Sequence, residues 1–111
     1  MTSELISSQI EDYVEHFVPD RPLEMIKFDL IFNDIDKHAY PDAFPVINEK
    51  LRSAGILIVD NMLWGGDVFD KNSNSPDTNG VREFTRNIIR DANWIASLIP
   101  IRDGLVLAYK K

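Results

Sequence analysis

The pattern of apolar and polar positions divides the chain into short segments. Residues 28–32 and 55–59 are apolar runs rich in Ile, Leu and Val, and each is followed by acidic or amide side chains. Runs of this kind suit strands buried on both faces of a parallel sheet. Between them Phe44, Ile47 and Leu51 recur at helical spacing, and Gly55 follows as a natural helix stop. The pattern predicts a strand, a helix over residues 43–51 and a second strand, which form one crossover unit.

The polar residues that follow the two predicted strands are expected at one edge of the sheet. Open parallel sheets bind ligands outside the carboxyl ends of their strands. Carboxylate and amide oxygens at such an edge suit a hard cation such as magnesium. Each residue taken alone is explained as well by a helix cap, a turn or a solvated charge, so the combination carries the prediction. The residues expected there are Asp34, Asp36, Lys37, Asp60 and Asn61.

The segments on either side of this unit complete an α/β fold. Residues 3–17 carry an apolar stripe at helical spacing, and Pro19 and Pro22 end that helix. A polar, turn-rich loop over residues 65–78 leads to a second helix, which Ser75 or Asp77 caps. Strands at 94–101 and 105–109 follow, joined by an Asp-Gly hairpin signal. We expect a sheet of about four strands, mostly parallel with a closing antiparallel hairpin.

The composition excludes several classes of protein. The chain has 111 residues, a net charge of −6 and no cysteine, so no disulfide can form. The acidic balance argues against binding to a nucleic-acid backbone, which needs a basic surface. No apolar run approaches the ~20 residues of a membrane span. The first residues lack the basic and apolar regions of a secretory signal, so a cytoplasmic location is expected.

Other candidate residues give weaker signals. His16 and His38 do not suggest a zinc pair. Trp64, beside two glycines, is equally well explained as a substrate-facing aromatic residue or as a loop anchor. Arg82 is interpreted as a surface charge, because a phosphate site would need a glycine-rich partner.

Several motifs together resemble a known family. Residues 28–32, Phe-Asp-Leu-Ile-Phe, lead into Asp34-Ile35-Asp36-Lys37 and Tyr40. This segment resembles the catechol and caffeoyl-coenzyme-A type O-methyltransferases, which depend on S-adenosylmethionine and have a Rossmann-like fold. Residues 59–66, Val-Asp-Asn-Met-Leu-Trp-Gly-Gly, resemble the family's second signature, and residues 76–78, 82–84 and 100–105 resemble its later landmarks. The likeness covers residues 28–111, and residues 6–25 are similar to the family's first helix and connector.

The resemblance implies a role for each candidate residue. Asp34, Asp60 and Asn61 would be ligands of a divalent metal, and Lys37 would be the general base. A metal bound to neighbouring oxygens of a catechol-like acceptor lowers the pKa of the hydroxyl that is methylated. Trp64 and Tyr40 would line the pocket for a small hydroxylated aromatic acceptor. Asp36 would take part in binding S-adenosylmethionine.

Four positions depart from the family pattern. Asn33 stands where an apolar residue is usual and Ile35 where a small one is. Thr85 replaces an expected amide, and Arg102 stands where glycine is common. These departures bear on the preference for the acceptor more than on membership of the family.

A larger departure is a missing segment. In the family, the first strands of the sheet and a glycine-rich cofactor loop lie between the first helix and the strand that begins here at Phe28. In this chain Met25 runs directly into Ile26, and none of the five glycines forms a Gly-x-Gly after a strand. The usual nucleotide cradle therefore cannot be built. The predicted units are residues 1–25, a helix and connector, and residues 26–111, the C-terminal half of a methyltransferase domain.

Two functions from different classes follow. The first is a metal- and S-adenosylmethionine-dependent O-methyltransferase, truncated and expected to be weakly active or inactive as it stands. The alternative is a non-catalytic remnant or oligomerising interaction module that retains at most a divalent-metal site. A half that needs a complementary chain is a third option. Because the strand at residues 28–32 becomes an apolar edge, we expect a homodimer or higher oligomer.

Overall fold

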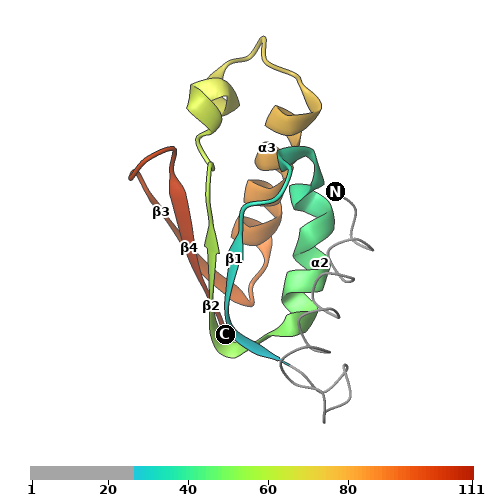
Figure 1. Ribbon diagram of the computed structural model, residues 1–111, viewed down its shortest axis with the longest axis vertical. Coiled ribbons are helices and arrows are strands. Elements are labelled where there is room, and N and C mark those ends of the chain that lie inside the picture. The colour runs from blue at the N-terminus through green and yellow to red at the C-terminus, as the bar shows by residue number, and fades with distance from the viewer. Residues whose placement is uncertain (1–26) are drawn as a thin grey trace.

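A computed structural model describes residues 27–111 (Figure 1). The helix predicted over residues 3–17 and the unit predicted over residues 1–25 lie outside the described residues. The strands are β1 (Phe28–Asn33), β2 (Leu51–Val59), β3 (Trp94–Ile99) and β4 (Leu105–Lys110). The helices are α2 (Tyr40–Lys50) and α3 (Pro76–Arg90), with short 3₁₀ helices η2 (Lys37–Ala39) and η3 (Trp64–Phe69).

The sheet confirms the predicted fold class. Its four strands lie in the order β1-β2-β4-β3. β1 pairs with β2 in parallel, and β4 is antiparallel to both β2 and β3, so β1, β2 and β3 run in one direction. Asn33 at the end of β1 is in register with Val59 at the end of β2. The residues that follow these two strands therefore begin at the same edge of the sheet.

The crossover between β1 and β2 has the predicted order of elements but different boundaries: the helix begins at Tyr40 rather than Ala43, and Leu51 belongs to the strand and not to the helix. α2 ends at Lys50, and β2 begins at once with Leu51, which is fully buried and pairs with Phe28. The prediction that Gly55 stops the helix was wrong. Gly55 lies inside β2, beside Ala54 with φ 66°, where the register with β1 shifts. A Cβ at Gly55 would lie 2.8 Å from the Leu51 side chain, so close backbone packing explains this glycine.

α3 begins as its sequence predicts. Ser75 is the N-cap, its hydroxyl accepts the N–H of Thr78 at 3.1 Å, and Pro76 occupies the first helical position. α2 and α3 lie side by side on one face of the sheet (Figure 1). The core lies between these helices and the sheet; its largest fully buried side chains include Tyr40, Phe84, Leu57 and Ile88.

The opposite face of the sheet carries exposed apolar side chains. Leu30 pairs with Ile56, Ile56 with Tyr109, and Tyr109 with Ile95, so these four residues form one row across the sheet. Leu30, Ile95 and Tyr109 are exposed, as are Phe32 and Leu107 in the next row. Within residues 27–111, no helix combines the length and hydropathy needed to cross a bilayer.

Candidate functional site

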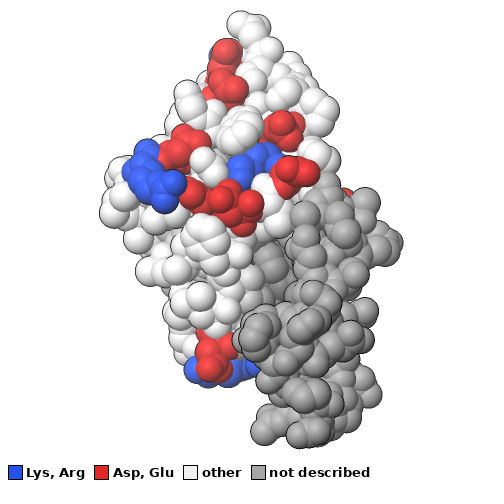
Figure 2. Space-filling model, in the orientation of Figure 1, with Lys and Arg blue, Asp and Glu red and all other residues white. Residues whose placement is uncertain are grey.

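The predicted site residues lie where β1 and β2 end. The N–H of Asp60 donates to the carbonyl of Asn33 at 3.2 Å, which holds the two strand ends together immediately before Asp34 and after Val59. The turn between β3 and β4 lies at the same end of the sheet (Figure 1). Figure 2 shows acidic and basic side chains gathered in a band across the molecule.

Lys37 is the central cation of this site. Only 7% of its surface is exposed, and its ammonium contacts other groups on several sides. Nζ donates to Asp34 Oδ1 at 2.7 Å and to the carbonyl of Ile35 at 3.0 Å. It also lies 4.8 Å from the ring centroid of Tyr40 and 5.8 Å from that of Trp64, within the range of cation–π attraction. A carboxylate and two aromatic rings therefore hold the amine in one place.

α3 packs against the backbone of Lys37 and fixes its position. Gly80 packs so closely that a Cβ there would lie 2.1 Å from the carbonyl oxygen of Lys37. The next residue is tied to the same helix, since the N–H of His38 donates to Asp77 Oδ1 at 3.0 Å. A helix can approach another backbone this closely only at glycine. The signal was present in the sequence as an isolated glycine within a helical pattern, but the sequence interpretation did not use it.

Tyr40 joins the core to the site. Its side chain is fully buried, and its hydroxyl donates to the carbonyl of Asp60 at 2.8 Å. Burial raises the pKa of this hydroxyl far above its ordinary value, and the carboxylates of Asp34, Asp60 and Asp103 raise that pKa further. Tyr40 is therefore a neutral hydrogen-bond donor that sets the position of the Asp60 backbone.

Asn61 is held by Asp60 and by Asp103, a carboxylate that was not among the predicted site residues. Asp60 Oδ1 accepts the N–H of Asn61 at 2.7 Å. Asn61, with φ 61°, donates from Nδ2 to Asp103 Oδ2 at 3.0 Å. The other oxygen of Asp103 accepts the N–H of Gly65 at 2.7 Å. In the sequence, Asp103 stands in the hairpin turn and in the family landmark at residues 100–105, and nothing local indicates that it reaches Asn61.

The other two candidate residues differ in how they are held. Trp64 begins η3 with φ 49° and packs, partly buried, against the core. Asp36 has an exposed side chain and precedes η2, where its carbonyl accepts the N–H of Ala39 at 3.0 Å. The structure thus brings Asp34, Lys37, Tyr40, Asp60 and Trp64 together and leaves the Asp36 side chain on the surface.

Arg82 is not a simple surface charge, so that interpretation was wrong. Its guanidinium donates to main-chain carbonyls of η3 and of the loop that follows it, so this segment wraps around one side chain of α3. No sequence pattern announces such bonds, because their acceptors are backbone atoms. The acceptors are the carbonyls of Val68 at 3.2 Å, Ser73 at 2.7 Å, Asp67 at 3.1 Å and Asp70 at 2.7 Å.

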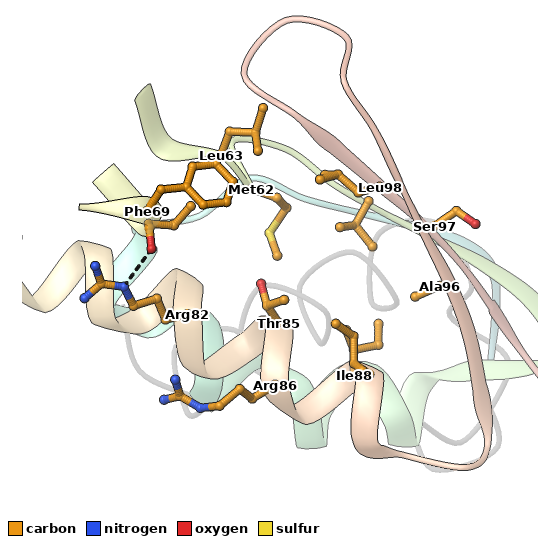
Figure 3. Close-up of a pocket in the computed structure, with 13 residues that line it drawn as sticks. Met62, Leu63, Phe69, Arg82, Thr85, Arg86, Ile88, Ala96, Ser97 and Leu98 are labelled. Atoms are coloured by element: carbon orange, nitrogen blue, oxygen red, sulfur yellow. Dashed lines mark hydrogen bonds between the residues drawn. The ribbon is translucent and has the colours of Figure 1, made fainter. Parts of the chain in front are cut away.

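A cavity of about 440 Å³ lies beside the site, between α3, η3 and the β3–β4 hairpin (Figure 3). Its walls are mostly apolar, with Met62, Phe69 and Leu98 facing Ile88 across it (Figure 3). None of the predicted site residues lines it. The predicted site residues therefore lie at the strand ends, outside the lining of this cavity.

The donor atoms at the strand ends suit a hard metal ion. Asp34 and Asp60 supply carboxylate oxygens. The amide nitrogen of Asn61 is committed to Asp103, which leaves its carbonyl oxygen as the acceptor. Oxygen donors of this kind fit magnesium. No group of three or more His, Cys, Asp or Glu side chains that could hold a metal occurs among residues 27–111, so an amide must complete such a site.

The described residues contain fewer groups suited to binding a nucleotide than to binding a metal ion. Gly65 and Gly66, with φ 63° and 91°, lie in η3, and no Gly-x-Gly turn follows a strand within residues 27–111. The arrangement of backbone N–H groups that usually cradles a dinucleotide or nucleoside is therefore not found in this part of the chain.

Comparisons with known proteins identify the family of this chain. A family model described as O-methyltransferase matches residues 2–111. A probable caffeoyl-CoA O-methyltransferase 2 of Dictyostelium discoideum is 34% identical over 84 residues, covering 75% of this chain and 36% of the relative. Catechol O-methyltransferase domain-containing protein 1 of Mus musculus is 35% identical over 83 residues, covering 75% of this chain and 32% of the relative. The chain spans well under half the length of these relatives.

Solved structures show the same fold. An O-methyltransferase from Bacillus cereus in complex with SAH matches with a TM-score of 0.73 and 26% identity, covering 91% of this chain and 47% of that chain. The O-methyltransferase TomG from Streptomyces achromogenes, in complex with SAM, matches with the same TM-score and identity and with 46% of its chain covered. This chain belongs to the S-adenosylmethionine-dependent O-methyltransferase family of the catechol and caffeoyl-CoA type.

Proposed function

We propose that this chain forms the metal- and acceptor-binding half of an O-methyltransferase active site. The observation that carries the proposal is the position of Lys37. A nearly buried amine lies 2.7 Å from Asp34 Oδ1 and beside the rings of Tyr40 and Trp64, at the edge where parallel sheets bind ligands. A lysine kept only for solubility has no need of this burial.

Asp34, Asp60 and Asn61 would hold a divalent cation such as magnesium. Bound there, the cation would lower the pKa of a coordinated acceptor hydroxyl. The main chain of Asp60 is already fixed, because Tyr40 donates to the Asp60 carbonyl and the Asp60 N–H donates to the carbonyl of Asn33. Such fixation lowers the entropy lost when a ligand binds.

Lys37 would act as the general base. Its Nζ would take the proton from the acceptor hydroxyl. S-adenosylmethionine, when bound, would supply the methyl group that the deprotonated acceptor oxygen takes. Trp64 would face the aromatic ring of the acceptor. Tyr40 is fully buried, and we propose that it shapes the acceptor pocket from behind through its contact with Lys37.

Few of the described residues are suited to binding S-adenosylmethionine. Asp36, whose side chain is exposed, is the residue that we propose for this role. Without a glycine-rich turn among the described residues, we infer that residues 27–111 bind metal and acceptor more readily than they bind the methyl donor. Turnover by this chain alone would then be weak or absent.

The test is a calorimetric titration of catechol into the protein with and without saturating Mg²⁺. We expect catechol to bind only with Mg²⁺, and Asp60→Asn to abolish the binding. Glu49→Gln removes an equal charge at the far end of α2 and serves as the matched control. Catechol binding that is independent of both Mg²⁺ and Asp60 would contradict the proposal. A second titration with S-adenosylmethionine separates an active enzyme from a half-site.

The open face of the sheet favours a second candidate, an oligomerising module. β1 is an edge strand, and exposed Leu30 and Phe32 continue the apolar surface of that face. Exposed apolar edges pair with other chains, so we propose a homodimer or higher oligomer. Light scattering coupled to size-exclusion chromatography should show a mass above the 12.7 kDa of one chain. Leu30→Lys should shift it toward the monomer, whereas Ile89→Lys on exposed α3 should not.

A further inference from the structure

We propose that Arg102 is an internal counter-cation for Asp60 that lowers the affinity of this site for a divalent metal. The inference rests on the metal site of the proposed function. Arg102 lies in the turn between β3 and β4, and its Nη2 is 3.7 Å from Asp60 Oδ2. Asp34, the other carboxylate proposed as a ligand, already has the Lys37 ammonium at 2.7 Å. Each of the two carboxylates therefore has a basic side chain beside it.

The two side chains differ in burial. Arg102 is the more exposed of the two, so its side chain is the one that can change position. The Asp60 side chain is 4% exposed, whereas that of Arg102 is 73% exposed. A buried carboxylate needs a compensating charge or hydrogen bonds. One oxygen of Asp60 has the Asn61 N–H, and the guanidinium faces the other. A long side chain on the surface can withdraw into water at little cost when a metal replaces it.

The separation also argues for exchange rather than for a permanent bond. At 3.7 Å the guanidinium is too far for a direct hydrogen bond and attracts the carboxylate only as a charge. A divalent cation bound to the same oxygen would meet a like charge, so the metal and this arrangement of Arg102 exclude each other. The guanidinium and the metal therefore compete for one carboxylate.

The backbone at Arg102 supports a role for its side chain. Its φ is 56°, in the left-handed region that glycine adopts without strain and a long side chain does not. Glycine would be the residue of least strain at this turn position. An arginine held in that conformation beside the site suggests that its charge contributes to function.

The experiment measures the dissociation constant of Mn²⁺ by calorimetry for the whole chain and a set of variants. Arg102→Gly removes the charge and relieves the strained backbone, so the variant is expected to fold, as circular dichroism would verify. We expect it to bind Mn²⁺ about two- to fivefold more tightly, because the charge that is removed lies mostly in water and contributes little energy. Arg102→Lys should restore the affinity of the unaltered chain. Arg102→Gln repeats the charge removal with an unchanged backbone preference.

Salt and a distant charge provide the controls. Arg90→Gln removes the same charge at the far end of α3 and should leave the dissociation constant unchanged. The difference between the unaltered chain and Arg102→Gly should shrink toward roughly 1 M salt, where the screening length falls to about 3 Å.

Three results would contradict the inference, and they are distinguishable. If Arg102→Gly binds Mn²⁺ no more tightly while Asp60→Asn abolishes binding, the proposed metal site stands and the role of Arg102 is wrong. If no variant binds Mn²⁺, or if Asp60→Asn binds as well as the unaltered chain, the metal site at Asp60 is wrong and the role of Arg102 falls with it. If Arg90→Gln matches Arg102→Gly, net charge alone explains the effect.

Discussion

The hydroxyl of Tyr40 donates a 2.8 Å hydrogen bond to the main-chain carbonyl of Asp60. This bond joins the first residue of α2 to the first residue after β2, although 20 positions separate them in the sequence. The Lys37 ammonium lies over the ring of Tyr40. The same ring packs against that of Phe84, with 5.5 Å between the two ring centroids. One buried side chain thus links the core to the candidate base and to a candidate metal ligand.

Replacing Tyr40 with phenylalanine should destabilise the fold by about 1–3 kcal/mol, because the buried Asp60 carbonyl loses its donor. The free energy of unfolding in urea measures this change. Tyr109→Phe is the matched control, since Tyr109 is 40% exposed on the open face of the sheet and should change stability by less than about 0.5 kcal/mol. Equal effects of the two substitutions would show that the Tyr40 hydrogen bond contributes nothing.

The same hydroxyl predicts a loss of stability at alkaline pH. Burial, followed by the carboxylates of Asp34, Asp60 and Asp103, raises the pKa of Tyr40 in the folded chain above its ordinary value of 10.0. Above pH 10 the folded state therefore keeps a proton that the unfolded state releases, and the free energy of unfolding falls as pH rises. Below pH 10 the contribution is complete.

The measurement compares urea unfolding of the unaltered chain and Tyr40→Phe between pH 8 and pH 11. The unaltered chain should lose stability by up to about 1.4 kcal/mol per pH unit more than the variant does above pH 10. Other groups that titrate in this range affect both proteins and cancel in the difference. Parallel profiles would mean that the Tyr40 hydroxyl ionises equally well in the folded and unfolded chains.

Gly80→Ala should destabilise the chain even though alanine is the better helix former. The helix gains about 1 kcal/mol from its intrinsic preference. The added Cβ would lie 2.1 Å from the Lys37 carbonyl, a backbone atom, and overpacking of this kind costs about 1–3 kcal/mol or more. Amide chemical shifts of residues 37 and 38 should move with it. Glu83→Ala, exposed on the same helix, should leave both stability and these shifts nearly unchanged.

Local patterns in the sequence were sufficient for most of the fold. Apolar runs predicted β1 and β2, and Ser75-Pro76 predicted the start of α3, because capping and periodicity depend on neighbours in the chain. The role of Gly55 was misjudged for the opposite reason. Its position depends on the pairing of Leu51 with Phe28, which is set by strands far apart in the sequence.

The sequence named the candidate site residues, but it did not indicate which other residues hold them in place. The motifs at the two strand ends named Asp34, Lys37, Asp60 and Asn61. Asp103 holds Asn61 from a distance of 42 residues in sequence, and Gly80 fixes the backbone of Lys37 through close packing. Contacts of this kind involve main-chain atoms or single long-range bonds, and they leave no periodic trace in the sequence.

Arg82 should be the most sensitive surface-facing residue of α3. Arg82→Met keeps the aliphatic contact but leaves the carbonyls of Val68, Ser73, Asp67 and Asp70 without their shared donor. We expect a loss of about 2 kcal/mol in the free energy of unfolding, less than the sum of separate bonds because several of these carbonyls face water.

Hydrogen exchange of the loop at residues 67–73 would test this role of Arg82 directly. Amides of that loop should exchange faster in Arg82→Met, while those of β2 keep their protection relative to the global stability. Arg86→Met, one turn further along α3, removes the same charge from an exposed position and should alter neither stability nor loop exchange. If both variants behave alike, the charge of α3 matters and the carbonyl contacts do not. If only Arg82→Met opens the loop, a single side chain orders the segment that follows Trp64 and so preserves one wall of the cavity beside the candidate site.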